Sequence, residues 1–138
     1  MRTFDTGATR DTDTGKLDYE GFLSPLVLRR YAEYMNKNRV QADGNVRDSD
    51  NWQKGIPLNA YMKSGWRHFM DWWMCHRGPQ YWPADRDCAD HECEDCNCID
   101  CDCADCFAID SGLEDALCAM LFNVMGYLHE ILKEKFDG

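Results

Sequence analysis

The feature that most constrains the fold is a long series of apolar residues at helical spacing toward the end of the chain. Its members recur every three or four residues, as one face of an α-helix requires: Leu113, Leu117, Met120, Leu121, Val124, Leu128 and Ile131. Ser111, followed three residues later by Glu114, has the pattern of a capping box, which predicts that the helix begins there. We expect this helix to extend to about Lys135.

A second helix is predicted over residues 25–38. Ser24 is a typical capping residue, and Pro25 suits the first helical position because its missing N–H would have no partner there. The apolar residues that follow return to one face at helical spacing.

A third helix is predicted from about Leu58 to His76. Ile56-Pro57 sets up its start, and Gly78 is a plausible stop signal. Gly65 in its middle costs roughly 1 kcal/mol against alanine, and it would allow another helix to approach closely.

These patterns predict an all-α protein. Residues 1–20 are expected to form a polar arm and residues 40–50 a polar loop, and no stretch predicts a strand. At 138 residues, of which 44% are hydrophobic, the chain is expected to be a single domain, residues 1–138. Its helices present more apolar surface than a partner helix in the same chain can cover, so we expect a homodimer.

Residues 84–108 form a cysteine- and aspartate-rich insertion between the last two predicted helices. Seven of the nine cysteines lie here, and no export signal precedes them, which favours reduced thiols over disulfides. C-x-C and C-x-x-C spacings bring two ligands to one Zn²⁺ ion. The predicted zinc ligands are Cys88, His91, Cys93, Cys96, Cys98, Cys101, Cys103 and Cys106. An acidic loop without metal remains the alternative.

The acidity of the chain is concentrated in the same insertion. The net charge is −10, and residues 85–106 contribute −8 of it, from nine acidic residues and one arginine. An acidic chain is not expected to bind nucleic acid through its phosphates. The chain has no run of about 18 apolar residues to span a membrane, and its first residues lack the apolar core of a signal peptide. We expect a cytoplasmic protein with no membrane partner.

An imidazole and three carboxylates are the candidates for chemistry. His68 and Asp71 are neighbours on one helical face because they are three residues apart. Asp71, Glu114 and Asp115 offer the oxygen ligands that Mg²⁺ prefers. A capping box explains Glu114 equally well, and an acid in the first turn of a helix is also favoured by the helix dipole. The spacing alone leaves both interpretations open.

Four sequence blocks, taken in order, resemble one known family. They are GATRDTDTGK at 7–16, SDNWQKGIP at 49–57, SGWRHFMDWW at 64–73 and EDALCAMLFNVMGYLHE at 114–130. In this combination the chain resembles the phage-encoded dATP/dGTP diphosphohydrolase N-terminal domain family, which is MazG-like. The resemblance covers roughly residues 1–77 and 111–135, and it leaves the cysteine-rich segment as an insertion.

The resemblance implies a MazG-like helical bundle that hydrolyses (d)NTPs, purine dNTPs above all, to the monophosphate and pyrophosphate with Mg²⁺ or Mn²⁺. A phage-encoded protein of this kind would work in the cytoplasm of the host cell. Its catalytic residues would be His68, Asp71 and Asp115, and its Mg²⁺ or Mn²⁺ ligands Asp71, Glu114 and Asp115. The expected substrate-binding residues are Arg10, Lys16, Asn51, Trp52, Lys54, Arg67 and Asn123.

The chain departs from the usual MazG metal motif. Such enzymes hold metal with an E-x-x-E pair on one helix and an E-x-x-D pair on the next. The first pair would here be His68-x-x-Asp71, and Cys118 stands where a second acid would follow Asp115. The alternative function is therefore a non-catalytic zinc-binding or interaction module on the same scaffold.

Overall fold

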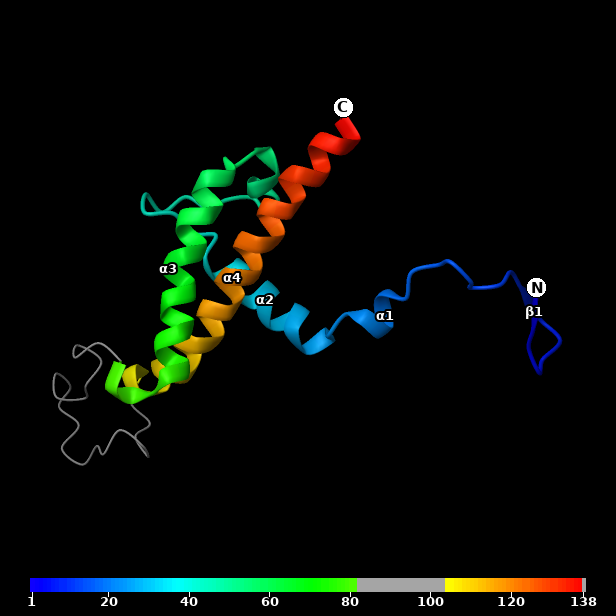
Figure 1. Ribbon diagram of the computed structural model, residues 1–138, viewed down its shortest axis with the longest axis horizontal. Helices are drawn as coiled ribbons and strands as arrows, with labels where there is room; N and C mark the ends of the chain where they lie inside the picture. Colours follow the sequence, from blue (N-terminus) through cyan, green and yellow to red (C-terminus); the bar gives the residue numbers. More distant parts are fainter. Residues whose placement is uncertain (82–103, 138) are drawn as a thin grey trace.

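A computed structural model describes residues 1–81 and 104–137, and these are mostly helical (Figure 1). The all-α prediction is confirmed at this level. One small antiparallel hairpin, which the sequence did not predict, pairs Arg2 with Arg10 and Thr3 with Thr9. In chain order the elements are β1 (Arg2–Thr3), β2 (Thr9–Arg10), α1 (Tyr19–Phe22), α2 (Pro25–Lys37), the 3₁₀ turn η1 (Asn51–Lys54), α3 (Leu58–Arg77), the 3₁₀ turn η2 (Pro79–Tyr81) and α4 (Ala104–Asp137).

Helix α2 begins as its sequence predicts. The Ser24 hydroxyl accepts a hydrogen bond from the Val27 backbone N–H at 3.3 Å, and Pro25 occupies the first helical position. The helix ends at Lys37, one residue before the predicted end.

Helix α3 also lies close to its predicted range. It starts directly after Pro57, which precedes the first helical residue instead of lying inside the first turn. It ends where Gly78 adopts a φ of +119°, a conformation that glycine reaches without the penalty of a Cβ. The Gly78 N–H donates to the Met74 carbonyl at 3.2 Å and satisfies one of the last carbonyls of the helix.

The predicted start of α4 is wrong. The helix begins at Ala104, so Ser111 lies inside it and does not cap it. Residues 104–110 contain no glycine or proline, and the helix continues through them without a breaker. The Glu114 carboxylate does not take part in a capping box, and it accepts a hydrogen bond from Arg30 Nε at 2.8 Å.

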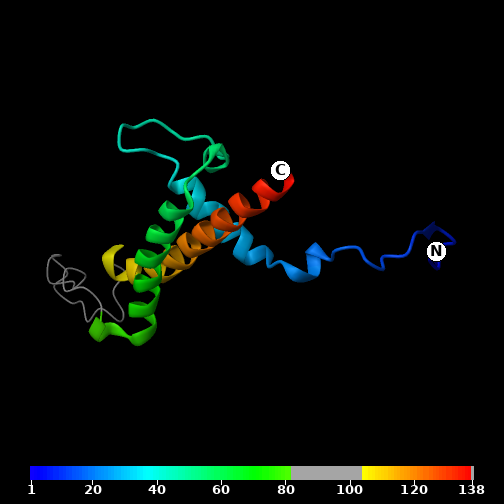
Figure 2. The same cartoon turned by 45° about the horizontal axis from the view of Figure 1, so that its top comes forward.

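The helices α3 and α4 run in opposite directions and cross, while α2 packs against α4 (Figures 1 and 2). Among the described residues the buried side chains are few and mostly small: Tyr61, Ala116, Cys118, Ala119 and Asn123. The core is therefore a thin seam between helices. In the described parts of the chain, no helix has the length and apolar character needed to cross a membrane.

The tightest point of the seam is Tyr61 against Gly126. A Cβ on Gly126 would collide with the Tyr61 ring and stand 2.6 Å from its hydroxyl oxygen. At Gly65 an added Cβ would meet Asn123 Cβ at 3.8 Å, an ordinary contact. The close approach that the sequence suggested at Gly65 is thus located at Gly126 instead.

The first part of the chain is an extended arm. The hairpin of β1 and β2 lies far from the helices in both views, and residues 11–18 connect it to α1 (Figures 1 and 2). Its apolar side chains are open to solvent, with Leu17 70% and Phe22 82% exposed. In both views the ribbon of the arm lies apart from α3 and α4 (Figures 1 and 2).

We predict that Gly126→Ala lowers the free energy of unfolding by about 1–3 kcal/mol, because the added methyl group overpacks the Tyr61 ring. Denaturant unfolding monitored by circular dichroism measures the change. Gly65→Ala is the matched control, since it makes the same substitution within a helix and has room for it. It should leave stability unchanged or raise it by up to about 1 kcal/mol. Equal effects of the two substitutions would contradict the assigned crossing point.

Candidate functional site

His68 and Asp71 lie next to each other on α3, as their spacing predicts. His68 Nδ1 is 3.9 Å from Asp71 Oδ2, and the His68 side chain is about one-third exposed. This distance is longer than a hydrogen bond, so the pair is an electrostatic contact. The two side chains follow each other on one face because three residues make nearly one helical turn.

A cavity of about 320 Å³ brings this pair together with α4 and the end of α2. Asp115 and Ala116 line it from α4, and Tyr34 and Lys37 line it from α2. The three residues predicted as catalytic, His68, Asp71 and Asp115, therefore share one cavity although more than forty residues separate the first from the last. We call it the acidic cavity.

A larger cavity of about 760 Å³ adjoins it. The two cavities have Tyr34, Asn38 and His68 in common, so His68 stands at their junction. Trp52 lines the large cavity from η1, and its ring meets His129 of α4 edge-on at a centroid distance of 4.7 Å. We call this second cavity the large cavity.

Two predicted substrate-binding asparagines also line the large cavity, Asn51 from η1 and Asn123 from α4. Asn123 is only 5% exposed. Its amide nitrogen donates to the Ala119 carbonyl at 2.8 Å and to the Ser64 hydroxyl at 3.3 Å. These bonds fix the side chain between α3 and α4.

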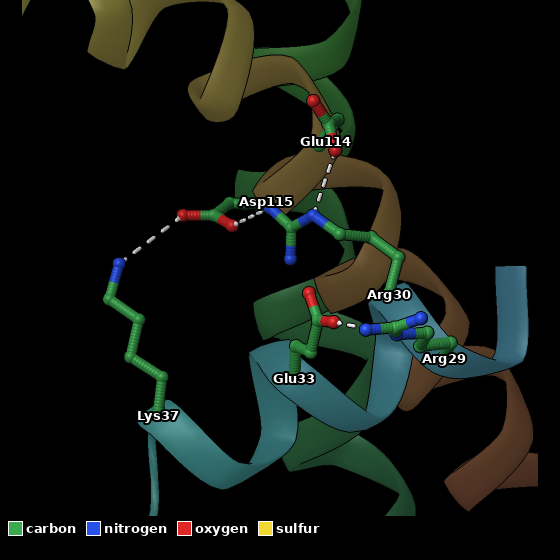
Figure 3. A network of polar contacts seen from close by, with 6 residues as sticks. All are labelled: Arg29, Arg30, Glu33, Lys37, Glu114 and Asp115. Carbon is green, nitrogen blue, oxygen red and sulfur yellow. Dashed lines mark hydrogen bonds and ion pairs between the residues drawn. The ribbon is translucent and has the colours of Figure 1, made fainter. Parts of the chain in front are cut away.

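The acids of α4 are paired with a cation from α2 (Figure 3). Arg30 Nε donates to Glu114 at 2.8 Å, and Arg30 Nη2 donates to Asp115 at 2.7 Å. The second oxygen of Asp115 lies 3.9 Å from Lys37 Nζ. The hydrogen bonds to Asp115 and then to Glu114 raise the pKa of Arg30 further above its ordinary value.

This arrangement does not fit a resident Mg²⁺ or Mn²⁺ ion on the predicted ligands. Within residues 1–81 and 104–137 no three or more His, Cys, Asp or Glu side chains gather closely enough to hold a metal. Glu114 and Asp115 already face the Arg30 guanidinium, whose charge repels a second cation. Of the predicted ligands, Asp71 alone lines the acidic cavity without a contact to Arg30.

The remaining predicted substrate residues do not line either cavity. Arg10 belongs to β2, and Lys16 belongs to the segment between β2 and α1. Both are part of the extended arm, whose ribbon lies apart from α3 and α4 (Figure 1). Lys54 in η1 and Arg67 in α3 are exposed, and neither residue lines the acidic cavity or the large cavity. These cations were predicted because they lie in the sequence blocks that resemble the family. Membership of a block does not determine whether a side chain faces a cavity or the solvent.

Other cations line the cavities in their place. Lys37 lines the acidic cavity, and Arg39 and Arg47 line the large one. Their sequence signal is weak, because Lys37 and Arg39 at the end of a helix are equally explained by the helix dipole. Arg47 lies in a polar loop, where a single arginine has no distinctive pattern.

The two cysteines outside the insertion are free thiols. Cys75 lines the acidic cavity, and Cys118 is buried in α4. Burial raises the pKa of the Cys118 thiol.

Most of the predicted zinc ligands lie outside the described residues: Cys88, His91, Cys93, Cys96, Cys98, Cys101 and Cys103. For Cys106 the backbone alone is described, within α4. The zinc site stays a prediction.

Comparison with protein-family models, with curated proteins and with solved structures finds no match to this chain.

We predict that the Arg30 ion pairs suppress metal binding by Glu114 and Asp115. Arg30→Gln removes the competing charge, so Mn²⁺ affinity should rise by about tenfold or more. Titration of the full chain with Mn²⁺, followed by the loss of the free-ion paramagnetic resonance signal, measures the affinity. Arg29→Gln is the matched control, because among the described residues Arg29 pairs only with Glu33 of its own helix, at 3.3 Å (Figure 3). Equal Mn²⁺ affinities for the natural chain and Arg30→Gln would contradict this account.

Proposed function

We propose that this chain is a nucleoside triphosphate pyrophosphohydrolase on a MazG-like scaffold. It would hydrolyse (d)NTPs, purine deoxynucleotides above all, to the nucleoside monophosphate and pyrophosphate. The resemblance of four sequence blocks suggests the reaction, and one structural observation supports it. The acidic cavity and the large cavity adjoin at His68, and together they collect six of the residues that the sequence nominated: Asn51, Trp52, His68, Asp71, Asp115 and Asn123.

The two cavities suit the two parts of a nucleotide. Trp52 offers an aromatic face to a base, and the Asn51 amide can donate to and accept from the edge of a purine. Asn123 can accept through its side-chain oxygen, because both of its N–H donors are used by Ala119 and Ser64. The reacting phosphates would then lie toward His68 and Lys37, where the large cavity meets the acidic one.

In this proposal His68 is the general base. Its Nδ1 is the nitrogen near Asp71, which leaves Nε2 to accept a proton from water. The water oxygen forms a bond to phosphorus, the water proton passes to His68, and the bond from phosphorus to the departing pyrophosphate oxygen breaks. Asp71 stabilises the imidazolium that results. Lys37 offsets negative charge on the phosphoryl oxygens.

The divalent ion enters this proposal with the substrate. Mg²⁺ is commonly held by one or two carboxylates together with substrate phosphates, and the described residues do not gather a full ligand set of their own. The substrate is therefore the magnesium complex of the nucleotide, and Asp71 is the carboxylate best able to contact it. The ion supplies neutralisation of phosphate charge.

We predict that His68→Gln lowers the rate of pyrophosphate release by about a hundredfold or more, the usual contribution of a general base. Asp71→Asn should lower it by at least about tenfold, because the imidazolium loses its stabilising carboxylate. Asp115→Asn should lower it by a similar factor, because Lys37 loses the carboxylate that it pairs with beside the cavity. Helix content should be unchanged in both variants. Release of pyrophosphate from a panel of dNTPs and NTPs with Mg²⁺ or Mn²⁺ measures the rate. Glu134→Gln is the control, since Glu134 is exposed near the end of α4.

Two outcomes count against this proposal in different ways. No pyrophosphate from any nucleotide would favour the alternative, a non-catalytic zinc-binding or interaction module. Full activity in His68→Gln would keep the enzyme but reject this site.

We also propose that the chain works as a homodimer through the apolar face shared by α3 and α4. Trp66 is 61% exposed and Val124 60% exposed, and both line an apolar groove of about 390 Å³ between the two helices. So much exposed aromatic and aliphatic surface is unusual for a monomer. A second copy of the same face would cover it by two-fold symmetry.

We predict that Trp66→Glu converts a dimer into a monomer at micromolar concentration, because a charge in the interface loses its water without gaining a partner. Sedimentation velocity distinguishes the two states. Phe136→Glu at the end of α4 introduces the same charge at a residue that is 88% exposed and lines no groove, and it should remain dimeric. A natural chain that sediments as a monomer would contradict the proposed assembly.

A further inference from the structure

The loop between α2 and η1 holds two arginines opposite each other. The Arg47 backbone N–H donates to the Arg39 carbonyl at 2.8 Å, and the Arg39 side chain donates through Nε to the Arg47 carbonyl at 2.8 Å. Inside this pair, Val40 and Val46 form an antiparallel bridge. These contacts close the base of the loop, so Arg39 and Arg47 are fixed side by side.

Both arginines line the large cavity. Among the described residues, neither makes an ion pair, whereas Arg2, Arg29 and Arg30 are all paired with carboxylates. Asp48 is the one carboxylate of the cavity lining, and it forms no ion pair with either arginine within the described chain. Two arginines in the lining of one cavity, without a carboxylate partner among the described residues, give it a positive charge that attracts an anion.

The rest of the cavity wall narrows the kind of anion. Trp52, Phe122 and Tyr31 contribute aromatic surface, and Asn51 and Asn123 contribute amides. A cationic edge beside aromatic and amide groups suits a ligand with an anionic end and a planar, hydrogen-bonding end. A nucleotide has both.

We infer that Arg39 and Arg47 form the phosphate-binding subsite of the large cavity. This inference rests on the proposed function and adds to it the residues that hold the phosphate chain. The Arg47 guanidinium makes no hydrogen bond among the described contacts, so it can bind phosphate oxygens through paired N–H donors, which lysine cannot reproduce. Arg39 adds its charge and its Nη2 donors, because its Nε and Nη1 already donate to the Arg47 carbonyl and to Asn36 Oδ1. Since Arg10 and Lys16 lie in the extended arm, Arg39 and Arg47 take the place that the sequence assigned to those cations.

Binding of inorganic tripolyphosphate to the full chain, measured by calorimetry without divalent ions, tests the subsite apart from catalysis. Arg47→Gln is the main variant, because among the described contacts the Arg47 side chain makes no hydrogen bond and only its backbone closes the loop. It should weaken tripolyphosphate binding by about tenfold, the loss of one charge-assisted contact. Arg47→Lys should recover part of this loss.

Arg29→Gln is the matched control, since it removes the same charge from an exposed residue that does not line the cavity. It should bind tripolyphosphate as the natural chain does. Equal binding by Arg47→Gln and the natural chain overturns the subsite, even if the protein releases pyrophosphate from dNTPs. Arginine-dependent tripolyphosphate binding in a chain that hydrolyses no nucleotide supports the subsite and overturns the proposed reaction alone.

Discussion

The contact of Tyr61 with Gly126 sets the geometry on which the rest of the structure depends. The aromatic ring occupies the space that a side chain on α4 would fill, so α3 and α4 approach closely at that level. About one turn further along each of the two antiparallel helices, Ser64 and Gly65 of α3 face Asn123 of α4. Further turns bring His68 and then Asp71 to the cavity wall that Asp115 shares. The close Tyr61–Gly126 contact at one end of the helix pair therefore sets the positions of His68, Asp71 and Asp115 at the other end.

Ion pairs link α2 to α4, and no residue of α2 is buried. Arg30 joins both Glu114 and Asp115, and Lys37 approaches the free oxygen of Asp115 (Figure 3). The same pairs neutralise the acids beside the candidate site. A carboxylate that is satisfied by arginine is a poor ligand for a divalent cation. The acidic cavity is therefore less anionic than its sequence suggests, which makes a negatively charged substrate easier to accept.

Local patterns predicted the parts of this molecule that depend on local interactions. Ser24 with Pro25 and the glycine at 78 fixed the ends of α2 and α3 to within one residue, because caps act within one turn. The neighbourhood of His68 and Asp71 followed from their spacing on a helix. The capping-box prediction failed because no breaker separates residues 104–110 from the helix that follows. The pairing of Arg30 with Asp115 spans 85 residues, and the pairing of Arg39 with Arg47 depends on loop closure, so neither leaves a sequence pattern.

The central claim is that the two adjoining cavities at His68 together bind a nucleotide. Nuclear magnetic resonance of the ¹⁵N-labelled full chain, titrated with an α,β-methylene analogue of dATP and Mg²⁺, tests it most directly, because the analogue binds without being cleaved. The account predicts saturable shifts of the Trp52 indole N–H and the Asn123 side-chain amide, and of the backbone at His68, Arg39 and Arg47, all of which line the cavities. Shifts confined to residues 1–23 of the arm, or no saturable shifts at all, would contradict it.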